Sequence, residues 1–131
     1  MANNIIVLTR GDTFDFDVTA YEELYGNFYS YAQEGDYLEF KLMYPNQDYF
    51  DENVPLFLEE QIVAGEHNDN CPVGCTQDHI MSYTFELNHD HTIKLPIGTY
   101  YYAVKLRRPA TNNQPVQYLT LVNKTKFIIN G

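Results

Sequence analysis

LPIGTYYYAVKL, the stretch from Leu95 to Leu106, decides the fold class of this chain. Pro96 and Gly98 predict a tight turn, and a run of strand-forming residues follows directly. The even positions of the run are large and mostly apolar, whereas the odd positions lead to Lys105 and Arg107. This alternation predicts a β-strand with one face in the core and the other toward solvent.

The same alternation recurs along the rest of the chain, which shows no repeat and no linker. About seven to eight short strands at this spacing predict an all-β, two-sheet sandwich, with residues 1–131 forming a single domain. We expect the strands at 5–8, 13–19, 36–44, 55–63, 80–87, 98–107, 116–122 and 126–129, of which the last two form either a hairpin arm or one bent, bulged terminal strand. We expect one core to contain Phe14, Phe16, Leu38, Phe40, Tyr102 and Val104.

Three segments read as connections because polar residues, glycine or proline interrupt them. Residues 21–36 are broken repeatedly by Glu, Gly and Asn, residues 46–53 are polar, and residues 64–79 form a long insertion. A structureless loop as long as 64–79 is uncommon in a small domain. Residues 88–91 predict a turn.

The formal net charge of −10 and the pI near 4.6 limit the classes of partner. An acidic surface repels phosphate backbones, so we expect no nucleic-acid binding. No apolar run reaches the length of a membrane span, so we expect no membrane contact. The first residues show no signal-like leader, which predicts a protein made in the cytoplasm. The negative charge favours partners with basic patches.

Four motifs carry a resemblance to a known family. They are RGDTFDF from Arg10, GDYLEFK from Gly35, LPIGTYYY from Leu95 and KTKFII from Lys124, in this order. The chain resembles the immunoglobulin-like β-sandwich structural proteins of tailed bacteriophages, and is similar to the N-terminal domain of siphophage baseplate upper proteins. The resemblance implies an immunoglobulin-like antiparallel two-sheet sandwich.

The resemblance also implies a function and a location. It implies a non-enzymatic structural or adaptor subunit of a virion, as a tail, baseplate or head (capsid) accessory protein made in the bacterial host cytoplasm. Its partners would be other virion proteins in a homo- or hetero-oligomeric assembly. The spacing Gly98-x-Tyr100-x-Tyr102 is typical of a tyrosine corner. We therefore expect these residues to be structural, with the Tyr100 hydroxyl bonded to the backbone between His91 and Leu95.

The spacing His67-x₃-Cys71-x₃-Cys75-x₃-His79 makes these four residues a weak zinc candidate. Thiolates and imidazoles suit zinc, but the spacing differs from paired C-x₂-C knuckles, and the intervening Pro and Gly prevent a single helix from carrying all four. Free thiols or a local disulfide between Cys71 and Cys75 remain open. We expect no metal and no cofactor.

No pattern in the sequence predicts catalysis. There is no G-x-S-x-G elbow and no glycine-rich phosphate loop, and carboxylate pairs such as Asp15/Asp17 fall on predicted solvent faces. We therefore expect a protein that is not an enzyme and acts by contact.

Surplus aromatic residues gather in segments 21–37 and 44–50, which flank the strand 38–43. We expect these two segments to present contacts at opposite ends of that strand. The interface candidates are Tyr25, Phe28, Tyr29, Tyr31, Tyr49 and Phe50. An alternative function is a carbohydrate-binding or host-surface-binding module, in which tyrosines stack on sugar rings. The absence of Trp argues against this alternative.

Overall fold

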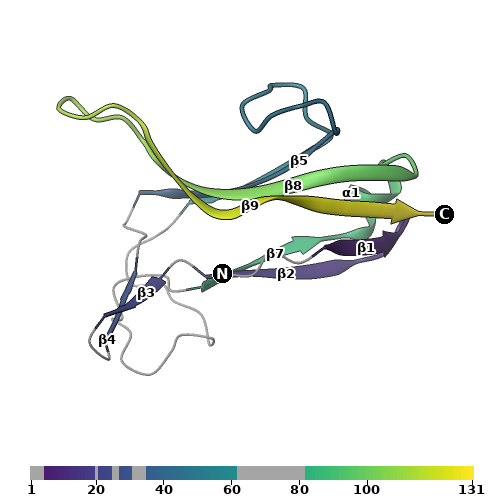
Figure 1. The fold of residues 1–131 in the computed structure, drawn as a ribbon, viewed down its shortest axis with the longest axis horizontal. Coiled ribbons are helices and arrows are strands. Elements are labelled where there is room, and N and C mark those ends of the chain that lie inside the picture. The colour runs from purple at the N-terminus through teal and green to yellow at the C-terminus, as the bar shows by residue number, and fades with distance from the viewer. Residues whose placement is uncertain (1–4, 20, 25–26, 31–34, 62–81) are drawn as a thin grey trace.

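The computed structural model describes residues 5–19, 21–24, 27–30, 35–61 and 82–131, and this part of the chain is all-β apart from one short helix. Figure 1 shows the elements in chain order. The strands are β1 (Ile6–Thr9), β2 (Phe14–Thr19), β3 (Tyr21–Leu24), β4 (Asn27–Ser30), β5 (Tyr37–Met43), β6 (Leu56–Gln61), β7 (Ser82–Leu87), β8 (Gly98–Arg108) and β9 (Gln117–Asn130). The helix is α1 (His89–Ile93).

The main sheet has five strands in the order β1-β9-β8-β5-β6. β8 is the predicted strand, and it ends at Arg108 because Pro109 cannot continue the ladder. β9 is one strand of 14 residues, so of the two alternatives for 116–122 and 126–129 the single terminal strand is confirmed. Its register against β8 shifts between Tyr102 and Lys105, as expected for a bulged strand.

The edge strand β1 pairs with β9 in parallel, with Ile6 opposite Phe127. The prediction of a wholly antiparallel sandwich is therefore wrong at this edge. β1 and β9 come from opposite ends of the chain, so no hairpin dictates an antiparallel direction. A turn then leads the chain away to β2, with the Asp12 amide donating to the Thr9 carbonyl at 2.9 Å and Gly11 at a φ of 93°.

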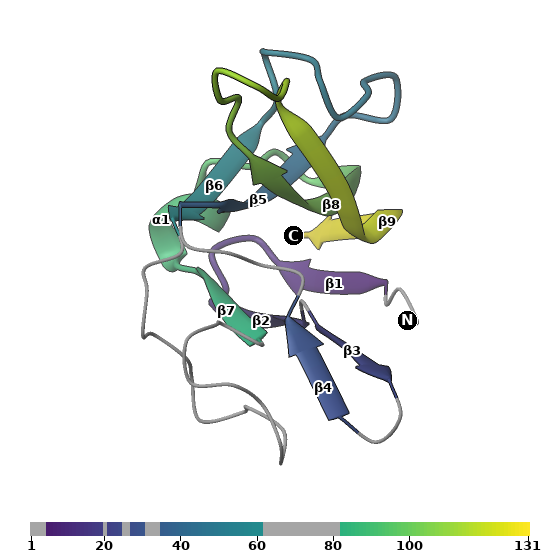
Figure 2. The same cartoon turned by 90° about the vertical axis from the view of Figure 1, so that its left-hand side faces the viewer.

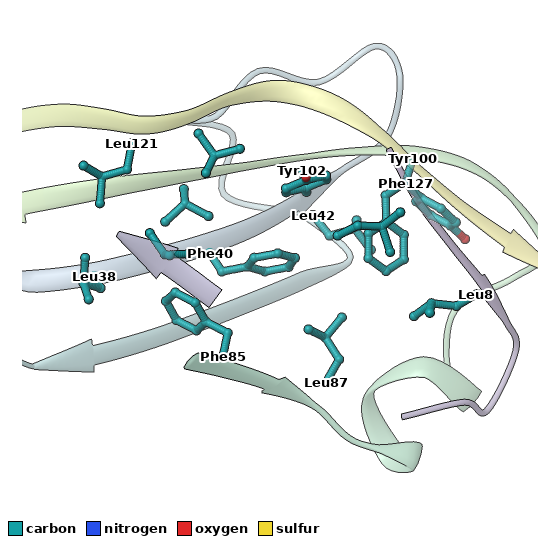
Figure 3. Packing of buried hydrophobic residues seen from close by; sticks show 14 of the residues in the cluster. Leu8, Leu38, Phe40, Leu42, Phe85, Leu87, Tyr100, Tyr102, Leu121 and Phe127 are labelled. Atoms are coloured by element: carbon teal, nitrogen blue, oxygen red, sulfur yellow. The ribbon is translucent and has the colours of Figure 1, made fainter. Parts of the chain in front are cut away.

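A second layer, the antiparallel pair β2 and β7, faces one side of the main sheet (Figures 1 and 2). The core fills the space between the two layers (Figure 3). Phe40 from β5 lies at its centre, with its ring 5.9 Å from Phe85 of β7 and 5.7 Å from Tyr102 of β8. The predicted core is confirmed: four of its members are buried, and Phe14 and Phe16 pack against them partly buried.

β3 and β4 form a two-stranded antiparallel sheet within residues 21–36, which the sequence analysis assigns to a connection. That assignment is wrong for these strands. The adjacent glutamates Glu22 and Glu23 break the period-two alternation on which the prediction depends. The ladder itself is regular, with Tyr21 opposite Ser30 and Leu24 opposite Asn27.

The predicted turn at 88–91 is replaced in part by the helix α1. The side chain of Asn88 accepts a hydrogen bond from the His91 amide at 2.9 Å, and His91 Nδ1 accepts one from the Asn88 amide at 3.1 Å. This reciprocal capping explains why a polar turn sequence forms one helical turn. The Thr92 hydroxyl donates to the Asp12 carbonyl at 2.7 Å and so ties α1 to the turn before β2.

The corner between α1 and β8 contains Tyr100. Its side chain is 2% exposed, and its hydroxyl donates to the Pro96 carbonyl at 2.5 Å. The acceptor lies one residue beyond the expected range, which ended at Leu95. Gly98 begins β8, and Tyr102 is fully buried in the core.

Candidate functional site

The face of the main sheet that points away from the core, the outer face, is where contacts between cationic and aromatic side chains gather. Core side chains of β5 and β8 alternate with outward ones, so the registers place Glu39 opposite Lys105 and Lys41 opposite Ala103. We define the outer face by Tyr37, Glu39, Lys41, Phe57, Glu59, Tyr101, Lys105, Arg107, Tyr118, Thr120, Lys124 and Lys126, together with Phe50 of the 44–55 loop.

The 44–55 loop lies over this face (Figure 1). The sequence analysis expects it to present a contact at one end of the strand 38–43 instead. Lys41 Nζ donates to the Tyr49 carbonyl at 2.9 Å and draws the loop back over β5. The Tyr49 ring packs with Met43, Ala103 and Val54 and is only 6% exposed. Tyr49 thus forms the inner side of the loop.

Beneath the loop lies a buried carboxylate, Glu39, on a strand face predicted to be in solvent. It is 4% exposed and accepts hydrogen bonds from the Tyr49 hydroxyl at 2.9 Å and from Arg107 Nε at 2.6 Å. Arg107 also reaches Glu59 at 3.2 Å. These bonds offset the cost of burying the charge. Burial raises the pKa of Tyr49 far above its ordinary value, and the neighbouring negative charge of Glu39 raises it further.

Two lysines of the outer face lie over the same aromatic ring, that of Tyr49. The Nζ atoms of Lys41 and Lys105 are 4.6 Å and 5.0 Å from the centre of the Tyr49 ring. Lys105 also donates to the Thr120 hydroxyl at 2.5 Å, and burial lowers its pKa. Cation–π contacts hold both ammonium groups without a carboxylate.

Three aromatic side chains of the outer face are exposed, Phe50, Phe57 and Tyr118, and two of them form a pair. Phe50 is 58% exposed and Tyr118 42% exposed, and their ring centres lie 5.1 Å apart at an angle of 81°. The Lys105 Nζ is 5.9 Å from the Phe50 ring. Of the predicted interface candidates, Phe50 belongs to this exposed pair, while Tyr49 lies underneath it.

Next to this pair, β8 and β9 project beyond the rest of the main sheet as a hairpin arm, residues 106–119 (Figure 1). Residues 109–123 contain no charged side chain, and every residue from 110 to 120 is exposed. An open hollow of about 400 Å³ on the arm is lined by Leu106, Arg108, Gln117, Tyr118 and Leu119. The core of a protein interface is likewise poor in charge and rich in aromatic residues.

The importance of β8 and β9 for the surface is missed by the sequence analysis, although a signal exists. Residues 91–131 contain six Lys or Arg and no Asp or Glu, whereas residues 1–90 contain all 18 acidic residues and two basic ones. The net charge of the whole chain conceals this asymmetry. The expectation of a basic partner therefore does not apply to the outer face, where basic side chains collect.

Most of the remaining predicted site residues lie outside the described part of the structure. This holds for Tyr25 and Tyr31 and for the weak zinc candidate, His67, Cys71, Cys75 and His79. Phe28 and Tyr29 lie in β4, of which the backbone is described. Within the described residues, no group of three or more His, Cys, Asp or Glu side chains is placed to hold a metal ion.

The fold and the outer face define an all-β protein with an aromatic and basic surface. Comparison with protein-family models, curated proteins and solved structures finds no match to this chain. None of the helical residues that the structure describes forms a helix long and apolar enough to cross a membrane.

Proposed function

We propose that this protein is a non-enzymatic contact subunit, a structural or adaptor component of a tailed-phage virion that binds neighbouring proteins through its outer face. The observation that carries the proposal is the exposed pair Phe50 and Tyr118, with Tyr118 inside the charge-free run 109–123. Large, rigid aromatic side chains at the surface are typical binding hot spots. The virion setting, as tail, baseplate or head accessory protein, is taken from the sequence resemblance.

An immunoglobulin-like sandwich is part of the same proposal. The strand order β1-β9-β8-β5-β6 across from β2 and β7 supports it, as does the bond from the Tyr100 hydroxyl to the backbone just before β8. In such a fold the side chains of the outer face do not pack into the core, so they are available to partners.

Two experiments test this function. Mass spectrometry of purified particles tests whether the protein is a virion component. The second is the double substitution Phe50→Ala with Tyr118→Ala, whose expected result is a folded protein with incorporation into particles reduced at least about tenfold.

The matched control is Ile97→Ala, which removes an apolar side chain that is 63% exposed and lies outside the outer face. It should leave incorporation unchanged. Wild-type incorporation of a folded Phe50→Ala, Tyr118→Ala variant overturns the proposal.

Glycan binding is a second candidate, favoured by the open hollow beside Tyr118. Arg108 and Gln117 line it as polar groups, and the Tyr118 ring offers a stacking surface. Phe50 does not line this hollow. Glycan binding by the isolated protein that is lost in Tyr118→Ala and retained in Phe50→Ala supports this candidate over protein contact.

A further inference from the structure

The outer face carries five of the eight basic residues of the chain. The register places Lys126 opposite Tyr101, on the side away from the buried Phe127, and the Lys124 ammonium lies 5.2 Å from the Tyr101 ring. The five residues are Lys41, Lys105, Arg107, Lys124 and Lys126.

The carboxylates near this face are mostly engaged. Glu39 and Glu59 are bound to Arg107. Asp48 and Asp51 accept hydrogen bonds from backbone amides of their own loop, at 2.8 Å and 3.0 Å. Within the described residues, the four lysines of the outer face form no ion pair, so their charge is available to an acidic partner.

The opposite side of the molecule is acidic. Asp15, Asp17 and Glu86 are exposed on the side of β2 and β7 that points away from the core, the acidic face. Asp15 and Glu86 are directly opposite each other across the two strands. Like charges in this position destabilise a strand pair, and these three carboxylates form no ion pair with any described residue. A cationic partner would relieve the repulsion.

A hollow next to the acidic face could receive such a cation. It lies between β6 and β7, has a volume of about 330 Å³ and is open to solvent. Three of its lining residues are glutamates, Glu59, Glu60 and Glu86, of which Glu59 is already paired with Arg107. Its size and charge suit the end of a lysine or arginine side chain.

We propose that the outer face of one copy of this chain docks onto the acidic face of a second copy. This rests on the proposed function, because it takes the outer face as the contact surface. The second copy follows from the charge distribution: one chain supplies both complementary surfaces, and the core between the layers keeps them from meeting within a molecule (Figure 1).

A contact between two different surfaces is head-to-tail, and it repeats into a ring or a filament. The net charge of −10 does not prevent it. At physiological salt, charges more than about 8 Å apart are largely screened, so the local complementarity of the two faces governs docking.

The test uses one variant for each surface. Lys124→Gln with Lys126→Gln neutralises the outer face, and Asp15→Asn with Asp17→Asn neutralises the acidic face. Sedimentation velocity is measured on the purified proteins up to about 1 mM. The wild type should form species larger than a dimer, and each variant alone should shift toward monomer by about tenfold or more in concentration.

Mixing the two variants gives the decisive result. Each retains the surface that the other has lost, so an equimolar mixture should form a one-to-one dimer and nothing larger. Lys94→Gln makes the same kind of charge change at the end of α1 and should assemble like the wild type. Thermal unfolding of each variant confirms that it is folded.

Three outcomes overturn the inference: a wild type that stays monomeric, folded variants that assemble as the wild type does, or variants that show no mutual rescue. If assembly is absent but Phe50→Ala with Tyr118→Ala still loses incorporation into particles, the partner is a different protein and the proposed function stands. If incorporation is also intact, both fail.

Discussion

Tyr100 illustrates how a single hydroxyl can stabilise a corner of this protein. Its bond to the Pro96 carbonyl closes the turn into β8 in a buried setting. We expect Tyr100→Phe to lower the free energy of unfolding by about 0.5–1.5 kcal/mol, the net value of one hydrogen bond, as measured by urea denaturation.

Tyr101→Phe provides the matched control. Tyr101 is the next residue, on the outer face, and its hydroxyl forms no hydrogen bond with the described residues, so its removal should change stability by less than about 0.5 kcal/mol. Equal unfolding midpoints for both variants would show that the Tyr100 hydroxyl is not structural.

Buried tyrosines should make the protein sensitive to alkali. Burial raises the pKa values of Tyr49, Tyr100 and Tyr102 in the folded state. Above about pH 10 an unfolded tyrosine releases its proton while one with a raised pKa retains it, so the free energy of unfolding should fall as the pH rises, by up to about 1.4 kcal/mol per pH unit for Tyr49.

The substitution Tyr49→Phe removes one of these titrating hydroxyl groups. Unfolding measured from about pH 9 upward should depend on pH less steeply than in the wild type, by a difference that grows to about one proton near pH 11. An identical slope would mean that Tyr49 ionises equally in both states and is not held beneath the loop.

Among the elements, the hairpin arm is anchored at its base to the start of β5. Arg108 at the end of β8 donates from Nε and Nη2 to the two carboxylate oxygens of the buried Asp36, at 3.1 Å and 3.0 Å. This two-pronged bond fixes the direction in which β8 leaves the sheet. The arm therefore projects from a rigid base.

Asp36→Asn should weaken that base. It replaces a charge-assisted pair with a weaker one, and we expect a loss of about 1.5–3 kcal/mol in the free energy of unfolding. Glu60→Gln, a neutralisation of an exposed carboxylate on β6, should cost less than about 0.5 kcal/mol. Equal stability of the two variants would contradict the anchoring role.

For the whole molecule, Phe40 joins the two layers. Its ring contacts Phe16 and Phe85 from the second layer and Tyr102 from its own sheet, and it is fully buried. Phe40→Ala should reduce the free energy of unfolding by about 3–5 kcal/mol, because it removes apolar contacts and leaves a cavity.

Phe57→Ala is the comparison for this prediction. Phe57 is 43% exposed on the outer face, so its loss should cost less than about 1 kcal/mol. Similar costs for the two phenylalanines would mean that the layers are not joined through Phe40.

The local sequence also predicts part of the candidate site. The exposed ring of Phe50 is among the predicted interface residues, and the charge-free run 109–123 and the missing carboxylates after Asp90 can be read directly from the chain. Tyr118 was not predicted, because it lies in a strand whose two faces look alike in sequence.

The sequence by itself determined the core and the strands other than β3 and β4, because a period of two reveals which side chains share a face. It also determined the end of β8 at Arg108, through Pro109. Only the tertiary structure decided that β1 joins β9 in parallel and that the 44–55 loop buries Glu39. Glu39 and Arg107 are 68 residues apart in the chain, and no local pattern records a contact made by packing at that distance.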